Sequence, residues 1–230
     1  MTLYKVLDAD LRSCHGGAAQ WVPGEWQLAV TDLRPCERGY HLLDEPRQIL
    51  LAWDPDGTLW EAEGRGATLR DVDQSVWEQA RITRQLHMPT RSEFVKLAAD
   101  FAAHVLPIWE AAYPNDPRPR KALAAACGHG DPYACAHAAN NAAFASANAF
   151  LTSATVDANT AYAAFAAAGA ADVAASATTH VPGGVTPHVL AAAYASSAAG
   201  DAASASDGDV GNAAERAWQN ARILEVINSG

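Results

Sequence analysis

The sequence predicts an α+β protein with three parts. These are a small β-rich N-terminal domain over residues 1–90, a connecting helix over residues 91–116 and an alanine-rich α-helical bundle over residues 117–230. Short apolar or alternating runs broken by Gly, Pro and Asp fill the first part, a pattern typical of strands. From Pro117 to Gly200 alanine dominates, and alanine has the highest intrinsic helix propensity.

The strands of the N-terminal domain are predicted from five apolar or alternating runs. The run before Trp53 and the run after it are joined by Pro-Asp-Gly, which favours a hairpin ending at Trp60. We expect the tryptophans of this part to supply large side chains to a small core. The five runs are Leu3 to Leu7, Trp26 to Val30, Ile49 to Trp53, Leu59 to Ala62 and Ala80 to Leu86.

A helix start is encoded after the last predicted strand. Thr90 is the expected N-cap and Glu93 lies three residues later, as in a capping box. The helix is expected from Arg91 to Tyr113, with Pro107 kinking or shortening it. Its predicted buried stripe is Phe94, Leu97, Ala98, Phe101, Val105 and Ile108.

The sequence of the third part predicts a helical bundle, whose helices are separated by breaks that contain Gly and Pro. Its last helix carries large apolar side chains that can cap the alanine core. The expected helices are Arg118 to Cys127, Pro132 to Thr152, Asp157 to Ala168, Ala170 to Thr179, Pro187 to Ser197 and Val210 to Ile227.

The composition narrows the classes of partner. A formal net charge of −10 disfavours nonspecific binding to nucleic acid or to an anionic membrane and is compatible with a basic protein partner. No secretory signal, transmembrane run or disulfide framework is visible, so a cytoplasmic location is expected. Without a phosphate-cradling loop, no cofactor is expected either.

Two groups of cysteine and histidine are candidate chemical sites. Four ligands in two Cys-x-His pairs, Cys127 with His129 and Cys135 with His137, suit zinc by type but not by spacing, and packing is favoured. Structural cysteines are likewise favoured over a nucleophile in the group Cys14, Cys36 and His41. No metal site is therefore expected.

An enzyme is the alternative hypothesis. The Tyr4-Lys5 strand, the Gly-Tyr-His41 element and Glu63 are similar in order to the arrangement in nicotinamide-cofactor-dependent, ADP-ribosyltransferase-like enzymes. His41 and Glu63 would then be catalytic. A glutamate at the end of a strand is more commonly a solvated residue.

Polar residues within the alanine helices give the predicted binding surface. His137, Asn141, Phe144 and Asn148 recur at helical spacing and share one face. Such residues either make interhelical hydrogen bonds or line a polar pocket that could hold a carboxylate or phosphate group. The other predicted members of that pocket are Arg118, Arg120, His180 and His188.

The N-terminal part carries three short motifs between Tyr4 and Leu86, namely Cys14, Cys36-Glu-Arg-Gly-Tyr-His41 and Glu61-Ala-Glu63-Gly. In these motifs it resembles an uncharacterised domain family of phage and prophage proteins. That family often has a second Cys where this chain has Leu43, so the resemblance implies ancestry rather than a metal site.

The C-terminal half carries motifs over residues 115–227 that include Asp116-Pro-Arg-Pro-Arg120 and Glu215-Arg-Ala-Trp218-Gln219. In these motifs it resembles the bacterial immunity protein family of polymorphic toxin systems. The resemblance implies a non-enzymatic module that binds and neutralises a partner protein, here a toxin or a host or phage protein. Trp218 and Gln219 are expected on its binding surface. The oligomeric state stays open.

Overall fold

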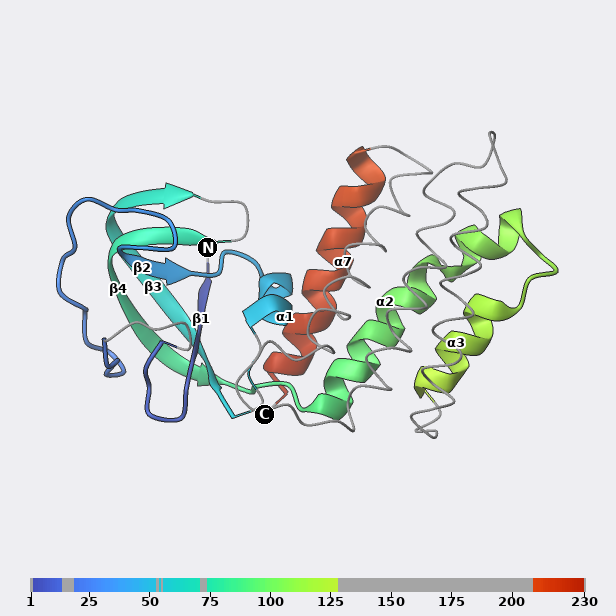
Figure 1. Cartoon of the computed structure of the whole chain (residues 1–230), viewed down its shortest axis with the longest axis horizontal. Coiled ribbons are helices and arrows are strands. Elements are labelled where there is room, and N and C mark those ends of the chain that lie inside the picture. Colours follow the sequence, from blue (N-terminus) through green and yellow to red (C-terminus); the bar gives the residue numbers. More distant parts are fainter. Residues whose placement is uncertain are drawn as a thin grey trace. The chain divides into compact units, whose positions relative to one another are not determined.

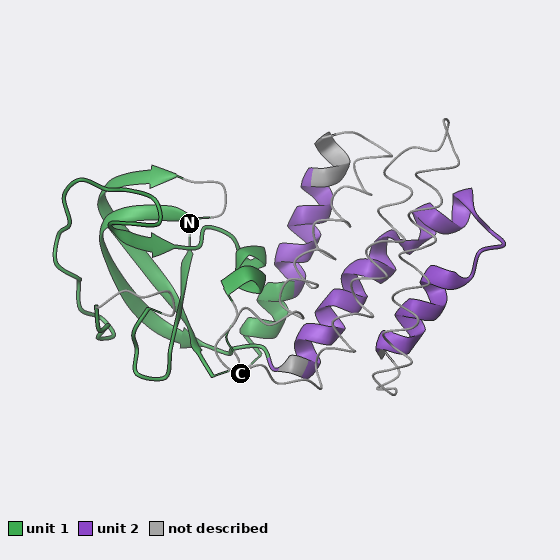
Figure 2. Ribbon diagram, viewed as in Figure 1, with its two compact units in different colours: residues 1–89, 223–230 green, residues 90–222 purple. Residues whose placement is uncertain are grey.

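The computed structural model describes residues 2–13, 19–52, 54, 56–70, 74–127 and 209–229. The chain divides into two compact units (Figure 2). The first comprises Met1–Pro89 with Ile223–Gly230, and the second comprises Thr90–Arg222. The domain boundaries at residues 90 and 116 stay predictions.

The first unit contains a four-stranded antiparallel sheet in the order β1-β3-β4-β2 (Figure 1). Three of the five predicted runs are confirmed, in β1, β3 and β4. The two central strands, β3 and β4, are long and pair with each other. The short strand β1 pairs with part of β3, and the short strand β2 pairs with part of β4. The strands are β1 (Leu3–Leu7), β2 (Tyr40–Leu42), β3 (Thr58–Arg70) and β4 (Ser75–Leu86).

The core of this unit forms on one face of the sheet. Trp21 is buried against it, with the ring of Tyr40 meeting its indole edge-on at a centroid distance of 5.6 Å. Trp21 and Trp60 are therefore core residues, as predicted, whereas Trp26 is only partly buried. The buried members are Leu3, Leu7, Trp21, Leu42, Trp60, Ala62, Ala80 and Ile82.

The predicted strand from Trp26 to Val30 is wrong, although the segment does lie along β4. Three backbone hydrogen bonds of 2.8 to 3.0 Å join them. Successive donors are three residues apart in the segment, whereas successive acceptors are two residues apart in β4. This mismatch prevents a regular ladder. The bonds run from the N–H groups of Gly24, Gln27 and Val30 to the carbonyls of Ile82, Ala80 and Glu78.

The predicted strand from Ile49 to Trp53, and with it the hairpin, is also wrong. A 3₁₀ turn η1 (Pro46–Gln48) leads directly into a short helix α1 (Ile49–Ala52). The turn has Pro46 in its first residues and a capping box between Glu45 and Gln48. These start signals override the strand preference of a short apolar run. Ile49 and Leu50 are buried from the helix instead.

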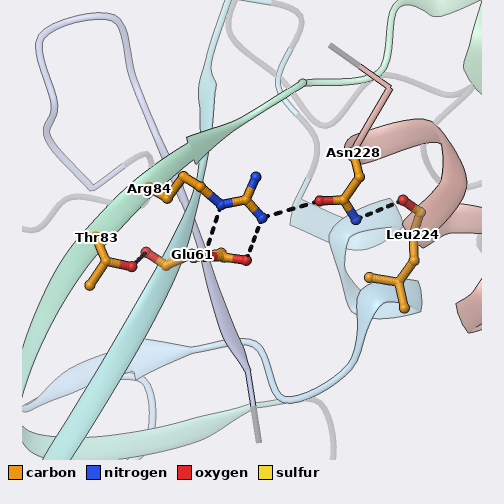
Figure 3. Close-up of polar contacts among 5 residues, drawn as sticks. All are labelled: Glu61, Thr83, Arg84, Leu224 and Asn228. Carbon is orange, nitrogen blue, oxygen red and sulfur yellow. Dashed lines mark hydrogen bonds and ion pairs between the residues drawn. The ribbon is translucent and has the colours of Figure 1, made fainter.

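The end of the chain returns to the sheet unit and is held at the end of β4 (Figure 3). Arg84 on β4 donates to both carboxylate oxygens of Glu61, and to the side-chain oxygen of Asn228 at 3.2 Å. The N–H of His87 donates to the carbonyl of Ile227 at 3.0 Å. The segment at His87, which precedes the second unit in the sequence, therefore lies beside the segment at Ile227, which follows it.

The second unit is helical in its described residues. The helices are α2 (Arg91–Ala112), α3 (Arg118–Cys127) and α7 (Asp209–Ile227), whose last five residues belong to the first unit. The three corresponding predicted helices are confirmed. The helices predicted between residues 132 and 197 lie outside the described residues.

Helix α2 starts as predicted. The Thr90 hydroxyl accepts from the N–H of Glu93, and the Glu93 carboxylate accepts from the N–H of Thr90. The predicted stripe is buried as far as Val105, whereas Ile108 is only half-buried and Trp109 is buried in its place. Pro107 lies within the helix and does not end it.

Candidate functional site

Helices α2 and α7 lie antiparallel and are joined by polar side chains. Asp100 accepts from Arg222 at 2.9 Å, and His104 contacts Glu215 at 2.5 Å. Because the residue number rises along one helix as it falls along the other, the two contacts define an antiparallel pair. The site described below lies at the His104 end.

Glu215 is a buried carboxylate whose two oxygens are both engaged. Its side chain is only 2% exposed, with one oxygen at Nδ1 of His104 and the other accepting from Nε2 of Gln219 at 2.8 Å. Gln219 lies one turn further along the same helix and is also buried. A carboxylate only accepts hydrogen bonds, so when Glu215 is ionised Nδ1 of His104 carries the hydrogen.

The buried stripe of α7 changes character along its length. The positions buried at intervals of four residues are Glu215, Gln219, Ile223 and Ile227. The two in the second unit are polar and the two in the first unit are apolar. Burying an acid and an amide costs free energy unless both are hydrogen-bonded, which here requires His104 from α2.

Trp218 lies against the other side of His104. The two rings are stacked at a centroid distance of 4.0 Å and are 4° from parallel, and Phe101 meets the indole edge-on at 6.0 Å. The His104 side chain is 45% exposed, and Trp218 is partly exposed. We call these residues, His104, Glu215, Trp218 and Gln219, the α2–α7 patch.

The two predicted arginines of α3 each hold a carboxylate of this chain. Arg118 binds Asp116 through two nitrogens, and Arg120 binds Glu110 in the same way. The hydrogen bond from Arg118 lowers the pKa of Asp116, and the same contact raises the pKa of Arg118. A pocket that uses these two arginines for a ligand group stays a prediction.

The remaining binding residues predicted from the sequence lie outside the described residues. They are His137, Asn141, Asn148, His180 and His188. His129 and Cys135 of the two Cys-x-His pairs lie there as well. Among the described side chains, no three His, Cys, Asp or Glu residues come together to hold a metal ion.

The two candidate catalytic residues are engaged by different partners. Nε2 of His41 on β2 accepts from the N–H of Cys36 at 2.8 Å. The half-exposed carboxylate of Glu63 on β3 accepts from Arg81 at 2.6 and 2.9 Å. The described residues therefore give the enzyme alternative no support.

Trp218 and Gln219 are both expected on the binding surface from the sequence, but only Trp218 is partly exposed; Gln219 is buried and supports Glu215 instead. The role of His104 is not predicted. The sequence does contain a signal for this residue. His104 lies one helical turn after the buried Phe101, so it borders the apolar face of α2. Nothing in the sequence pairs it with Glu215, since that contact joins residues 111 positions apart.

A comparison with known protein families matches most of the second unit. The family model described as Imm-5 like putative immunity protein matches residues 84–226, more than half of the chain and the whole α2–α7 patch. No curated protein and no solved structure matches the chain. The phage-domain resemblance of the N-terminal part stays a prediction. No described helix is long and apolar enough to cross a membrane.

Proposed function

Because this chain belongs to the Imm-5 like immunity protein family, we propose that it binds and neutralises a toxin protein through the α2–α7 patch. The observation that carries this proposal is the stack of Trp218 on His104. Both side chains are partly exposed, and the buried carboxyl group of Glu215 holds Nδ1 of His104. Tryptophan is enriched at the energetic centres of protein interfaces, above all where its orientation is preorganised.

The fixed geometry favours binding over catalysis for this patch. Nδ1 of His104 is committed to Glu215, and the described residues place no serine, threonine or cysteine nucleophile against the imidazole. The patch instead presents a flat aromatic and imidazole surface whose side chains lose little rotamer freedom on binding. The net charge of −10 favours a basic toxin surface and fast association.

The direct test is neutralisation in living cells. Toxin domains of polymorphic toxin systems would each be expressed in a susceptible bacterium with and without the full chain, and growth would be followed. We expect the full chain to restore growth and Trp218→Ala to restore it poorly. Arg216→Ala is the matched control, because Arg216 is an exposed neighbour on α7 outside the patch.

Two results would overturn the proposal. One is a failure of the folded wild-type chain to restore growth or to bind the purified toxin domain. The other is full neutralisation by Trp218→Ala with unchanged affinity, measured by calorimetry on variants whose circular dichroism matches the wild type.

A further inference from the structure

One ring nitrogen of His104 in the α2–α7 patch has no partner in the described part of the chain. Nδ1 contacts the Glu215 carboxylate at 2.5 Å, whereas Nε2 makes no hydrogen bond to a described residue. The His104 side chain is 45% exposed. A carboxylate only accepts hydrogen bonds, so the hydrogen of the neutral imidazole lies on Nδ1 and Nε2 keeps its lone pair. The patch therefore offers a hydrogen-bond acceptor at Nε2.

A second hydrogen bond holds the Glu215 carboxylate in place. Its other oxygen accepts from Nε2 of Gln219 at 2.8 Å, and the Glu215 side chain is only 2% exposed. Turning the carboxylate away would leave buried polar groups without partners. His104 thus meets a partner with its acceptor already oriented, which reduces the entropy lost on binding.

The negative charge of Glu215 is not balanced by another described residue when the imidazole is neutral. Asp100, one turn along α2 from the patch, is already paired with Arg222 at 2.9 Å. Arg216 is exposed and lies two residues before Trp218, about 160° around the helix from it. A buried charge is screened less by salt than an exposed one. The patch therefore favours a donor that carries a positive charge.

The parallel planes of the two rings favour a planar cation. A hydrogen bond to Nε2 lies in the plane of the His104 imidazole, and the Trp218 indole is 4° from parallel to that plane at a centroid distance of 4.0 Å. An indole is larger than an imidazole, so part of its face extends beyond the stack. A guanidinium in the imidazole plane can stack over this part, whereas an ammonium has no flat face. Arginine therefore fits the patch better than lysine.

We propose that Nε2 of His104 accepts a hydrogen bond from an arginine of the partner protein, whose guanidinium lies parallel to the Trp218 indole. Glu215 is a positioning residue of this site. It fixes the hydrogen on Nδ1 and supplies the negative charge from a buried position, without touching the arginine. The arginine belongs to the toxin, so this inference rests on the proposed function and adds the chemical group that the patch recognises.

The position of the imidazole hydrogen can be measured on the free full chain. Long-range ¹H–¹⁵N correlation spectra at about pH 8 distinguish protonated from unprotonated ring nitrogens. We expect a protonated Nδ1 and an unprotonated Nε2 in His104. Glu215→Gln should move the hydrogen to Nε2, because Gln219 still donates to the amide oxygen and the amide nitrogen then donates to Nδ1.

N-acetyl-arginine methylamide is the probe for the recognised group. It would be titrated into the ¹⁵N-labelled full chain at low salt, alongside the corresponding citrulline and glutamate derivatives. Citrulline keeps the planar end of arginine but has no charge. We expect the arginine derivative to shift the Trp218 indole N–H and the His104 ring signals, and to bind at least about fivefold more tightly than the citrulline derivative. The glutamate derivative should not bind.

Variants test each part of the site. His104→Phe keeps a ring against Trp218 but removes Nε2, so it should abolish binding of the arginine derivative. Glu215→Gln removes the charge and turns Nε2 into a donor, so it should remove the preference for arginine over citrulline. Glu25→Gln is the matched control, because it makes the same change at an exposed acid of the sheet unit. Both affinities should stay unchanged in that variant.

Three results would reject this arginine site. These are a hydrogen on Nε2 of His104 in the free wild-type chain, equal affinity for the arginine and citrulline derivatives, and an unchanged preference in folded Glu215→Gln. If Glu215→Gln does not fold, wild-type binding by folded His104→Phe rejects the site instead. None of these measurements needs a toxin, so they test the site independently of the growth assay, which decides the immunity function.

Discussion

The imidazole of His104 lies flat on the indole of Trp218, with the centroids 4.0 Å apart and the planes 4° from parallel. The two rings come from different helices, α2 and α7. Each ring has a second contact, since Glu215 holds Nδ1 of His104 and the edge of Phe101 meets Trp218. The partly exposed stack is therefore a rigid surface supported by a buried carboxyl group.

Replacing Glu215 with alanine should lower the free energy of unfolding by about 2–4 kcal/mol. The change leaves the donors of Gln219 and His104 without their acceptor and opens a small void in a buried position. Glu215→Gln keeps the volume and should cost about half as much. Urea unfolding followed by circular dichroism measures both variants.

The control for this prediction is Arg216→Ala, at an exposed position of the same helix next to Glu215. It should change the stability by less than about 0.5 kcal/mol. An equal loss in Glu215→Ala and Arg216→Ala would contradict the assignment of Glu215 as the buried support of the patch.

The stack itself should appear as an energetic coupling between His104 and Trp218. A double-mutant cycle with His104→Ala, Trp218→Ala and the double variant should give a coupling of about 0.5–1.5 kcal/mol. The reason is that each single change removes the same ring contact. Stability losses that simply add would show that the rings are neighbours without mutual stabilisation.

Local signals made some of the fold predictable. The capping box of Thr90 and Glu93 and the apolar stripe from Phe94 define α2 within a few residues. The apolar or alternating runs that begin at Leu3 and Ala80 also predict strands correctly, because alternation and β-branched residues are local properties.

The failures have physical reasons that a local pattern does not contain. Ile49 begins an apolar run that fits a strand or a helix, and the preceding Pro46 and Gln48 decide for the helix. The segment near Gln27 lies along β4 with mismatched spacing, so it reads as a strand without forming one. The pairing of His104 with Glu215 depends on tertiary packing across more than a hundred residues.

Arg84→Ala should increase amide exchange at the end of the sheet unit. Arg84 holds Asn228 beside Glu61, and His87 donates its N–H to the carbonyl of Ile227 (Figure 3). Without the guanidinium Asn228, just after α7, loses its hydrogen bond to β4, so the neighbouring His87 amide should open more often. Hydrogen exchange followed by NMR measures this rate.

Arg65→Ala is the matched comparison, because Arg65 lies on the same hairpin and binds Gln79 rather than the end of the chain. His87 should exchange at the wild-type rate in that variant. If both variants accelerate exchange equally, the effect belongs to the hairpin in general and not to the contact with Asn228.

Asp116 should make stability depend on pH on the acid side. The hydrogen bonds from Arg118 lower the pKa of this carboxyl below its ordinary value of 3.8 in the folded state. A lowered pKa means that the unfolded chain binds the proton more readily. The contribution is therefore fully present above the ordinary pKa and is lost as the pH falls through the lowered one.

Asp116→Asn isolates that charge, because asparagine still caps the N–H of Arg118 while losing the ion pair. Arg118 is 39% exposed, so solvent screening keeps the difference between wild type and variant below about 1 kcal/mol at pH 7. The difference should shrink steadily in urea titrations between about pH 4 and pH 2. A difference that stays constant down to pH 2 would mean that the pair contributes through packing and not through the carboxylate charge.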